Sequence, residues 1–432
     1  MPTSDLGRIN YAFMDRYLLT LSGRYDGSSK LAEGNKWAFF PSAAVAWRIN
    51  EETFMNEVDW VSSLKLRVSY GQIGNDSVDP YGSLGTVSGS QYASLGTNNI
   101  IGNYPNNLRN DKLTWEKTAV WNIGLDFGFF NNRISGSFEY YNRKTTDLIM
   151  AKKIPTHLGY ESINDNVGSV RNQGIELALN TVNFQNKYFN WNTSLTVAYN
   201  KNEIIELDYK EDLGVYSDQL KGMQGDYSNL WIIGQPIDVL YNYQTLGVWQ
   251  LGEEEQAKKY GQKPGQFKVR DFDGDGTIDN DKDRFLNGQQ TPKWTGGMTN
   301  NFKLYDFDFG IQMYWQLGGR DRNQFKVLWA MENNNDRFSV MALDYWTPEN
   351  PSNTMAQPSN MGPYRDPNNG RRQATHNTEK TDFLKCSYMT LGYTLKKSLV
   401  SRFKVSNFRV YATVQNPFLI TGFSGFDPEQ PQ

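Results

Sequence analysis

The 432-residue chain contains very few of the residues that build disulfides and histidine-based sites. Its one cysteine, Cys386, cannot form an intrachain disulfide, and its two histidines, His157 and His376, stand far apart. We therefore expect no thiolate metal cluster, no histidine zinc site and no histidine-dependent catalytic triad. A lone cysteine in a predicted strand is more often a small buried or lipid-facing residue than a nucleophile.

Long apolar runs and a basic excess of charge are also missing. No run of about 18 apolar residues occurs, so the sequence predicts no transmembrane helix. The net charge of -3 and the pI of about 5.7 argue against nucleic-acid binding. A mean hydropathy of -0.65 does not exclude a membrane protein, because the strands of a transmembrane barrel are only half apolar.

Strict two-residue alternation is the pattern that the chain does have. Between residues 64 and 70, Leu64, Leu66, Val68 and Tyr70 fall on one face of an extended strand, and Lys65, Arg67 and Ser69 fall on the other. The alternation predicts eleven strands in all, around residues 17–26, 39–49, 64–70, 121–127, 134–140, 175–179, 191–199, 294–302, 307–315, 389–395 and 408–414. Spans of about 9–12 residues suit tilted transmembrane strands.

The predicted connections alternate between short turns and long polar stretches, as they do in outer-membrane barrels. Residues 72–111 and 318–382 are predicted as long loops. One short turn precedes the strand at residues 191–199, and another follows the strand at residues 294–302. Both strands therefore meet residues 201–293 on the outer side of the membrane. This segment must then contain an even number of membrane spans, and we expect zero. This segment is therefore predicted as one large outer excursion, in which residues 241–249 form a local sheet.

The fold class predicted from these patterns is all-β, an antiparallel transmembrane β-barrel with long extracellular loops. A soluble all-β protein with half-buried sheets would show the same alternation. The apolar faces favour the barrel because they carry almost no charge, and Lys or Arg at the bilayer midplane would cost about 2–4 kcal/mol. The aromatic content of 14% suits two interfacial girdles, although sugar-binding surfaces are also rich in aromatic residues.

Several passages are similar, in the same order, to the C-terminal half of the SusC/RagA family of TonB-dependent outer-membrane transporters. These passages span nearly the whole chain, at residues 17–29, 66–75, 166–176, 264–265 with 271–279, 292–297, 389–395 and 409–416. The resemblance implies a 22-stranded barrel, plugged from the periplasm and powered by the TonB complex. It further implies a Bacteroidota-like outer membrane, a SusD-like lipoprotein lid, and import of glycans or peptides.

The same resemblance leaves parts of the family pattern unmatched. We find no TonB box, plug, N-terminal extension or signal peptide, and no final strand after residues 425–429. Residues 1–432 are therefore interpreted as a partial barrel domain, one that we expect neither to close a pore nor to transport by itself. The alternatives are a soluble or surface-attached all-β glycan-binding protein with a calcium-braced loop and, third, a β-rich glycoside hydrolase.

An acidic loop matches the front of an EF-hand-type calcium loop. Its predicted ligands are the carboxylates and the position-7 carbonyl of Asp271, Asp273, Asp275, Thr277 and Asp279. Position 12, normally a bidentate acid, is Lys282, and Asp281 or Asp283 would have to substitute with a shift in register. The sequence predicts a weak structural calcium site, with an ion-free Asp/Gly turn as the alternative.

Aromatic residues in the predicted outer loops are candidates for stacking on cargo, or else they pack the loops together. They are Trp231, Tyr243, Trp249, Trp329 and Tyr364. The basic pairs Arg371-Arg372 and Lys396-Lys397 suit a solvated rim or contact with anionic head groups. No G-x-S-x-G, H-E-x-x-H or P-loop pattern occurs, and Glu253–Glu255 resembles a charged surface run, so no enzyme is predicted.

Overall fold

The computed structural model describes residues 3–95, 98–154, 157, 160, 162–227, 229–279, 282–323, 344–357 and 375–429. The chain divides into two compact units, Met1–Thr181 with Asn200–Asp208, and Val182–Tyr199 with Tyr209–Gln432. Among the described residues, no helix has the length and apolar character needed to cross a membrane.

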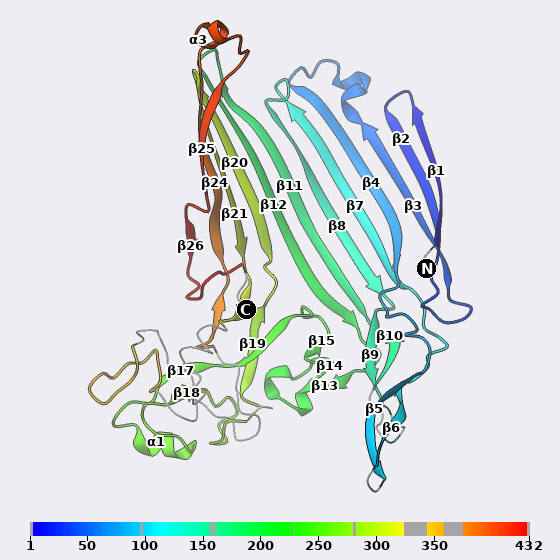
Figure 1. The fold of residues 1–432 in the computed structure, drawn as a ribbon, viewed down its shortest axis with the longest axis vertical. Helices are drawn as coiled ribbons and strands as arrows, with labels where there is room; N and C mark the ends of the chain where they lie inside the picture. Colours follow the sequence, from blue (N-terminus) through cyan, green and yellow to red (C-terminus); the bar gives the residue numbers. More distant parts are fainter. Residues whose placement is uncertain are drawn as a thin grey trace. The chain divides into compact units, whose positions relative to one another are not determined.

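The first unit is an antiparallel ladder in which each strand pairs with the next one along the sheet. Its strands lie side by side in Figure 1, from blue to green. They are β1 (Thr3–Phe13), β2 (Tyr17–Gly27), β3 (Trp37–Arg48), β4 (Val61–Asn75), β7 (Glu116–Phe129), β8 (Ile134–Thr146) and β11 (Ser169–Gln185).

The register of this ladder collects the alternating residues into continuous rows. One row is apolar across the whole unit and consists of Tyr11, Leu19, Val45, Val68, Ile123, Tyr140 and Ile175. The adjacent row, on the opposite face, consists of Ala12, Leu18, Ala46, Arg67, Gly124, Glu139 and Glu176. The predicted separation into an apolar and a polar face is therefore confirmed in these two rows, where charge occurs only in the second.

The second unit repeats this organisation. Its ladder strands are β12 (Phe189–Glu206), β20 (Trp294–Leu304), β21 (Phe307–Leu317), β24 (Phe383–Thr394), β25 (Arg409–Gln415) and β26 (Leu419–Thr421). Both β25 and β26 pair with β24, so they form one edge that is interrupted at residues 416–418. An apolar row again crosses the unit, through Trp191, Phe302, Phe309, Leu391 and Ala412.

Aromatic pairs mark both ends of the apolar face in the first unit. Tyr17 stacks on Trp47 at 6.5 Å near the short turns, and Tyr25 stacks on Trp37 at 5.0 Å near the long loops. Tyr17 and Tyr25 begin and nearly end β2, and the strand between them is about 26 Å long at about 3.3 Å per residue. At a tilt of about 40° such a strand rises about 20 Å across the bilayer, so rings at both ends of it lie towards the two edges of the apolar band of about 25 Å in membrane barrels.

Strand β1 corrects the predicted number of spans. The sequence pattern gave eleven strands beginning near residue 17, whereas Thr3–Phe13 forms a further strand that pairs with β2 along its whole length. The prediction missed it because only Ile9, Tyr11 and Phe13 continue the apolar alternation. Gly7 and Asp5 occupy the same face nearer the start of the strand.

The long connections are more structured than predicted. Residues 72–111 were expected to be a plain loop, but they hold the hairpin of β5 (Thr86–Leu95) and β6 (Asn98–Asn107). A second small sheet joins β9 (Ile149–Lys153) to β10 (Ser162–Asn166). A third joins β22 (Arg320–Arg322) to β23 (Thr378–Lys380). Pairing among neighbours satisfies backbone groups that a long loop would otherwise expose.

The segment between β12 and β20 forms small sheets of its own, while β12 pairs directly with β20. Its strands are β13 (Glu211–Asp212), β14 (Gln224–Asp226), β15 (Trp231–Ile232), β16 (Val239–Tyr243), β17 (Thr245–Val248), β18 (Phe267–Val269) and β19 (Arg284–Gln289), and its helix is α1 (Glu254–Lys259). The local sheet expected at residues 241–249 is confirmed, because β16 pairs with β19 and β17 with β18. A buried cluster of Leu213, Leu220, Ile232 and Tyr241 gives this segment an apolar core.

Candidate functional site

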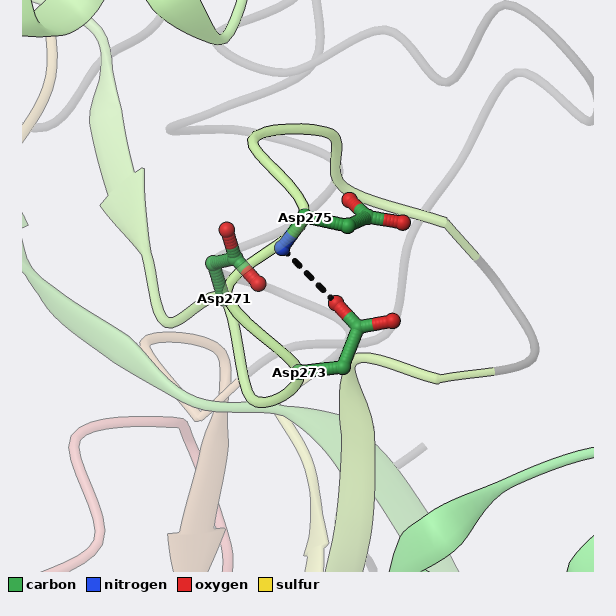
Figure 2. Close-up of side chains that lie close together, drawn as sticks. All are labelled: Asp271, Asp273 and Asp275. Carbon is green, nitrogen blue, oxygen red and sulfur yellow. Dashed lines mark hydrogen bonds between the residues drawn. The ribbon is translucent and has the colours of Figure 1, made fainter.

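The acidic loop between β18 and β19 brings its first three aspartates together. Asp271, Asp273 and Asp275 each offer a carboxylate oxygen, and these oxygens lie within 4.8 Å of one another. Figure 2 shows the three side chains around one tight turn, with the Asp275 backbone N–H donating to the Asp273 carboxylate at 3.2 Å. Three hard oxygen donors at such spacing can contact one calcium-sized cation.

Backbone N–H groups hold the turn in this shape. The Asp271 carboxylate accepts hydrogen bonds from Gly274 N at 2.6 Å and Gly276 N at 3.0 Å. Gly276 has a φ of 85°, in the left-handed region that residues with a Cβ adopt only at a cost. Gly276, at position 6 of the loop, therefore provides the sharp turn that an EF-hand-type loop makes there.

Lys282 supplies a cation from the chain itself. Its Nζ lies 3.0 Å from Asp273 Oδ2 and 3.1 Å from Asp275 Oδ2. The pKa of Asp275 falls to about 2, first because the Thr277 hydroxyl and backbone N–H donate to it and then because Lys282 does. Lys282 is the main cause of the lowered pKa of Asp273. Both carboxyl groups are therefore ionised at neutral pH.

The remaining predicted ligands make local hydrogen bonds. The Asp279 carboxylate accepts from Lys282 N at 2.7 Å, and the Thr277 hydroxyl donates to Asp275 at 2.7 Å. Asp283, one of the two suggested substitutes for position 12, is fully buried. Its two oxygens accept from Phe272 N and Asp279 N. Asp283 thus braces the loop, and burial raises the pKa of its carboxyl group. Asp281 lies outside the described residues.

The donor set fits calcium in part. Three clustered carboxylates supply the first ligands of an EF-hand-type loop. Against them, the Lys282 ammonium already neutralises two of the three, at the end of the loop where the usual pattern has a bidentate acid. An ion bound by all three aspartates would require Lys282 to move away.

Two of the five candidate aromatic residues are buried. Tyr243 is 1% exposed and Trp249 is 3% exposed. The Tyr243 hydroxyl donates to the Asp279 carbonyl at 3.0 Å, and the Trp249 Nε1–H donates to the Gln262 side chain at 2.7 Å. In this structure both rings pack inside the loop segment, which is the role that the sequence analysis gave as the alternative to stacking on cargo. Trp231 is half-buried in β15, and Trp329 and Tyr364 lie outside the described residues.

Sequence reasoning did not single out a charged network on the polar face of the first unit. Arg67 in β4 donates to Asp126 in β7 at 2.9 and 2.7 Å, and to Glu139 in β8 at 2.7 Å. Glu139 also accepts from the Asn122 side chain at 3.0 Å. The alternation placed Arg67 on the polar face, but only the register between strands shows that two acids stand beside it.

A comparable polar region lies in the second unit. Arg409 in β25 donates twice to the Asp308 carboxylate in β21, from Nε at 3.0 Å and from Nη2 at 2.5 Å. Beside this pair is a hollow of about 360 Å³. Its polar lining consists of Asn190, Asn192, Asn301, Lys303, Asp308, Tyr388, Thr390 and Arg409. Amides, hydroxyls and charges of both signs are the expected lining of a water-filled barrel interior.

Comparison with known proteins agrees with this architecture. The family described as "TonB dependent receptor-like, beta-barrel" matches residues 7–320. TonB-dependent receptor P26 of Formosa agariphila is 34% identical over 433 residues, which cover 99% of this chain and 42% of that protein. TonB-dependent receptor SusC of Bacteroides thetaiotaomicron is 32% identical over 441 residues, covering 99% of this chain and 41% of SusC.

Solved structures show the same fold. The structure of the RagAB peptide transporter superposes with a TM-score of 0.78 at 26% identity, over 99% of this chain and 45% of the matched chain. The chain therefore spans less than half the length of each of these relatives. These matches favour a membrane barrel over a soluble glycan-binding protein or a hydrolase. The chain belongs to the TonB-dependent receptor-like β-barrel family, and its strands form part of an antiparallel outer-membrane barrel with long extracellular loops.

Proposed function

We propose that this chain forms part of the barrel of an outer-membrane importer of glycans or peptides. The importer would work with a SusD-like lipoprotein and with the TonB complex, in transport rather than catalysis. The family supports the transport class, and the name of the RagAB structure supports a peptide as one cargo of this group of proteins. The resemblance of the sequence to SusC/RagA transporters supports glycans as the other class of cargo.

One observation carries the proposal. The ladder separates an uncharged apolar row through Val68 from a charged row through Arg67 on the opposite face. In a membrane the first row contacts lipid tails, whereas the second faces an interior where water and polar cargo can pass. A soluble sheet that buried its apolar face would leave Val45 and Ile123 covered, yet they are 51% and 47% exposed.

An uptake assay tests the transport proposal. Cells that express the full-length receptor and cells that lack it are given labelled oligosaccharides and labelled peptides in parallel. We expect one of the two cargo classes to enter only when the receptor and an intact TonB complex are both present. Equal uptake of both classes with and without the receptor would overturn the proposal, and turnover of a sugar by the purified receptor would support the hydrolase alternative.

Trp231 is the candidate cargo contact among the aromatic residues that the structure describes. It is half-buried, unlike Tyr243 and Trp249, and it lies in the excursion between β12 and β20. We expect Trp231→Ala to weaken cargo binding by the full-length receptor, because the sugar rings of a glycan or the aromatic side chains of a peptide stack on an accessible aromatic face. Trp249→Ala serves as a comparison, since it should disturb loop packing instead. Trp329 and Tyr364 stay predictions.

We also propose that the acidic loop is a weak structural calcium site. The clustering of Asp271, Asp273 and Asp275 supports the site, and Lys282 weakens it. Titration of the full-length receptor with terbium, which reports calcium sites by luminescence, should show saturable binding that calcium displaces. Asp271→Asn should abolish this signal, while Glu254→Gln on helix α1 should leave it unchanged. A signal that is the same in both variants would favour the ion-free turn.

A further inference from the structure

The turn between β24 and β25 carries a concentration of positive charge. Residues 395–408 contain four basic residues and no acidic residue. The four are Lys396, Lys397, Arg402 and Lys404, and all four are exposed. Among the described residues, none of them forms an ion pair. A cluster of unpaired cations attracts an anionic partner, because each cation otherwise repels its neighbours.

The turn has a defined structure. Helix α3 (Lys397–Val400) is followed by a single 3₁₀ turn, and the left-handed Lys404, with a φ of 58°, ends it. The buried Val400 fixes the turn, and its carbonyl accepts a hydrogen bond from Val405 N at 3.3 Å. Leu395 N donates to the Phe408 carbonyl at 2.9 Å and closes the base. The cations are therefore held on a short structured turn.

Apolar side chains are exposed beside the cations. Leu399 and Phe408 are 52% and 50% exposed. By the two-residue alternation of a strand, Phe408 falls on the same face as Val410 and Val414. These two valines pair with Tyr393 and Met389 of β24, which lie on the apolar face. The apolar face of the barrel thus continues directly into the basic turn, at the level where a membrane changes from tails to head groups.

Neighbouring turns supply an aromatic belt at the same level. Thr394 N donates to the Asp306 carbonyl at 2.8 Å, and Tyr305 N donates to the Tyr188 carbonyl at 2.7 Å. The rings of Tyr188 and Tyr305 lie 5.1 Å apart. Tyrosine is enriched at the interface between tails and head groups. Within this unit, the basic turn lies at the end of β24 and β25 away from β17, β18 and α1 (Figure 1).

We propose that the turn at residues 395–408 is a binding site for anionic phospholipid head groups in the leaflet opposite the long loops. The four cations supply the charge that phosphate groups recognise, while Leu399 and Phe408 insert among the first carbons of the acyl chains. Clusters of four to eight basic residues beside a membrane span bind anionic lipids by this combination. The assignment goes beyond transport, since it concerns how the barrel is anchored and oriented in its bilayer.

Native mass spectrometry of the full-length receptor in detergent tests the assignment. The receptor is titrated in parallel with phosphatidylglycerol and with zwitterionic phosphatidylcholine. The variant combines Lys396→Gln, Lys397→Gln, Arg402→Gln and Lys404→Gln. Its matched control combines Lys210→Gln, Lys221→Gln, Lys258→Gln and Lys259→Gln, which removes the same charge from exposed positions in the β12–β20 segment.

The receptor and the control variant should prefer phosphatidylglycerol by about tenfold or more, and the turn variant should lose that preference. Binding of phosphatidylcholine should be the same in all three proteins. A preference that persists in the turn variant, or one that is lost equally in the control, overturns the assignment, as does a receptor without any preference. If the fourfold variant fails to assemble, the Lys396/Lys397 and Arg402/Lys404 pairs are changed separately, and each should lower the preference in part.

Discussion

Aliphatic side chains are exposed on the membrane strands but buried in the β12–β20 segment. In the strands, Val45 and Ile123 point outward and are about half exposed, while charged groups such as Arg67 occupy the other face. In the segment, Leu213 and Leu220 are fully buried. The difference lies in the solvent, because hydrocarbon tails cover the strands, whereas the segment must build its own interior in water.

Truncation inside the water-facing segment should have the largest effect. Leu220→Ala removes a fully buried side chain from the cluster with Leu213 and Ile232, and such changes cost about 2–5 kcal/mol. We expect the segment to become sensitive to protease while the barrel still migrates as a folded species on unheated gels. Leu251→Ala, at an exposed position in the same segment, should change neither. Equal sensitivity of the two variants would mean that the cluster does not hold the segment together.

A charge introduced on the lipid side of a strand should destabilise the barrel more than the same charge on the polar side. Val68→Arg places a cation in the apolar row and should cost about 2–4 kcal/mol near the bilayer midplane. Ser69→Arg, one residue along β4, places it on the polar face and should be tolerated. The measurement is the free energy of unfolding in lipid vesicles, together with the amount of receptor in the outer membrane. Insertion of both variants at the normal level would contradict the orientation of β4.

A polar group on the apolar face sharpens the comparison further. Asn300 in β20 lies on the apolar face, next to the row through Phe302, and its Oδ1 accepts from Trp191 Nε1 at 3.0 Å and from Thr193 Oγ1 at 2.6 Å. Asn300→Leu should destabilise the barrel by about 0.6–1.7 kcal/mol, because lipid offers the two donors no replacement. Asn301→Leu on the polar face is the control. A more stable Asn300→Leu receptor would show that these hydrogen bonds contribute less than the added apolar contact.

The last comparison concerns calcium binding rather than folding. Lys282→Glu replaces the resident ammonium by the acid that position 12 normally carries, and we expect calcium affinity to rise about tenfold or more. Lys282→Gln, which only removes the charge, should give a smaller rise. Isothermal titration of the full-length receptor measures both, and an unchanged affinity in Lys282→Glu would indicate that residue 282 does not reach the ion.

The pH dependence of this site follows from the same contacts. Hydrogen bonds from Thr277 and Lys282 lower the pKa of Asp275 to about 2 from the usual 3.8. The stabilisation from these contacts is therefore fully present above pH 3.8 and is lost as the pH falls towards 2. Terbium binding that already falls above pH 3.8 would point instead to Asp283, whose pKa burial raises.

Local patterns were enough to predict most of the strands, because alternation is a property of each segment by itself. The Leu64–Tyr70 pattern placed β4 and both of its faces correctly. The sequence missed β1, where Gly7 and Asp5 interrupt the apolar face. It also missed the β5–β6 hairpin, since that polar stretch, rich in Gly, Ser and Asn, carries little alternation.

In the candidate site, too, local patterns predicted the features that depend on one short segment and missed those that depend on distant ones. The convergence of Asp271, Asp273 and Asp275 depends on a short turn with its glycines, so spacing alone predicted it. The burial of Tyr243 and Trp249 depends on distant segments. Thr375 N, for example, donates to the Tyr243 carbonyl at 3.0 Å. No local pattern contains such a contact, and the same is true of the two acids beside Arg67.

Lys282 gives the acidic loop a counterion that a chelator cannot remove. Its ammonium is attached to the chain, so the loop should keep its shape at a cell surface where divalent cations become scarce. An incoming calcium ion would have to displace this amine, and the loop would gain only the difference between the two cations. The segment is thus suited to a steady shape across changing ionic conditions rather than to sensing calcium.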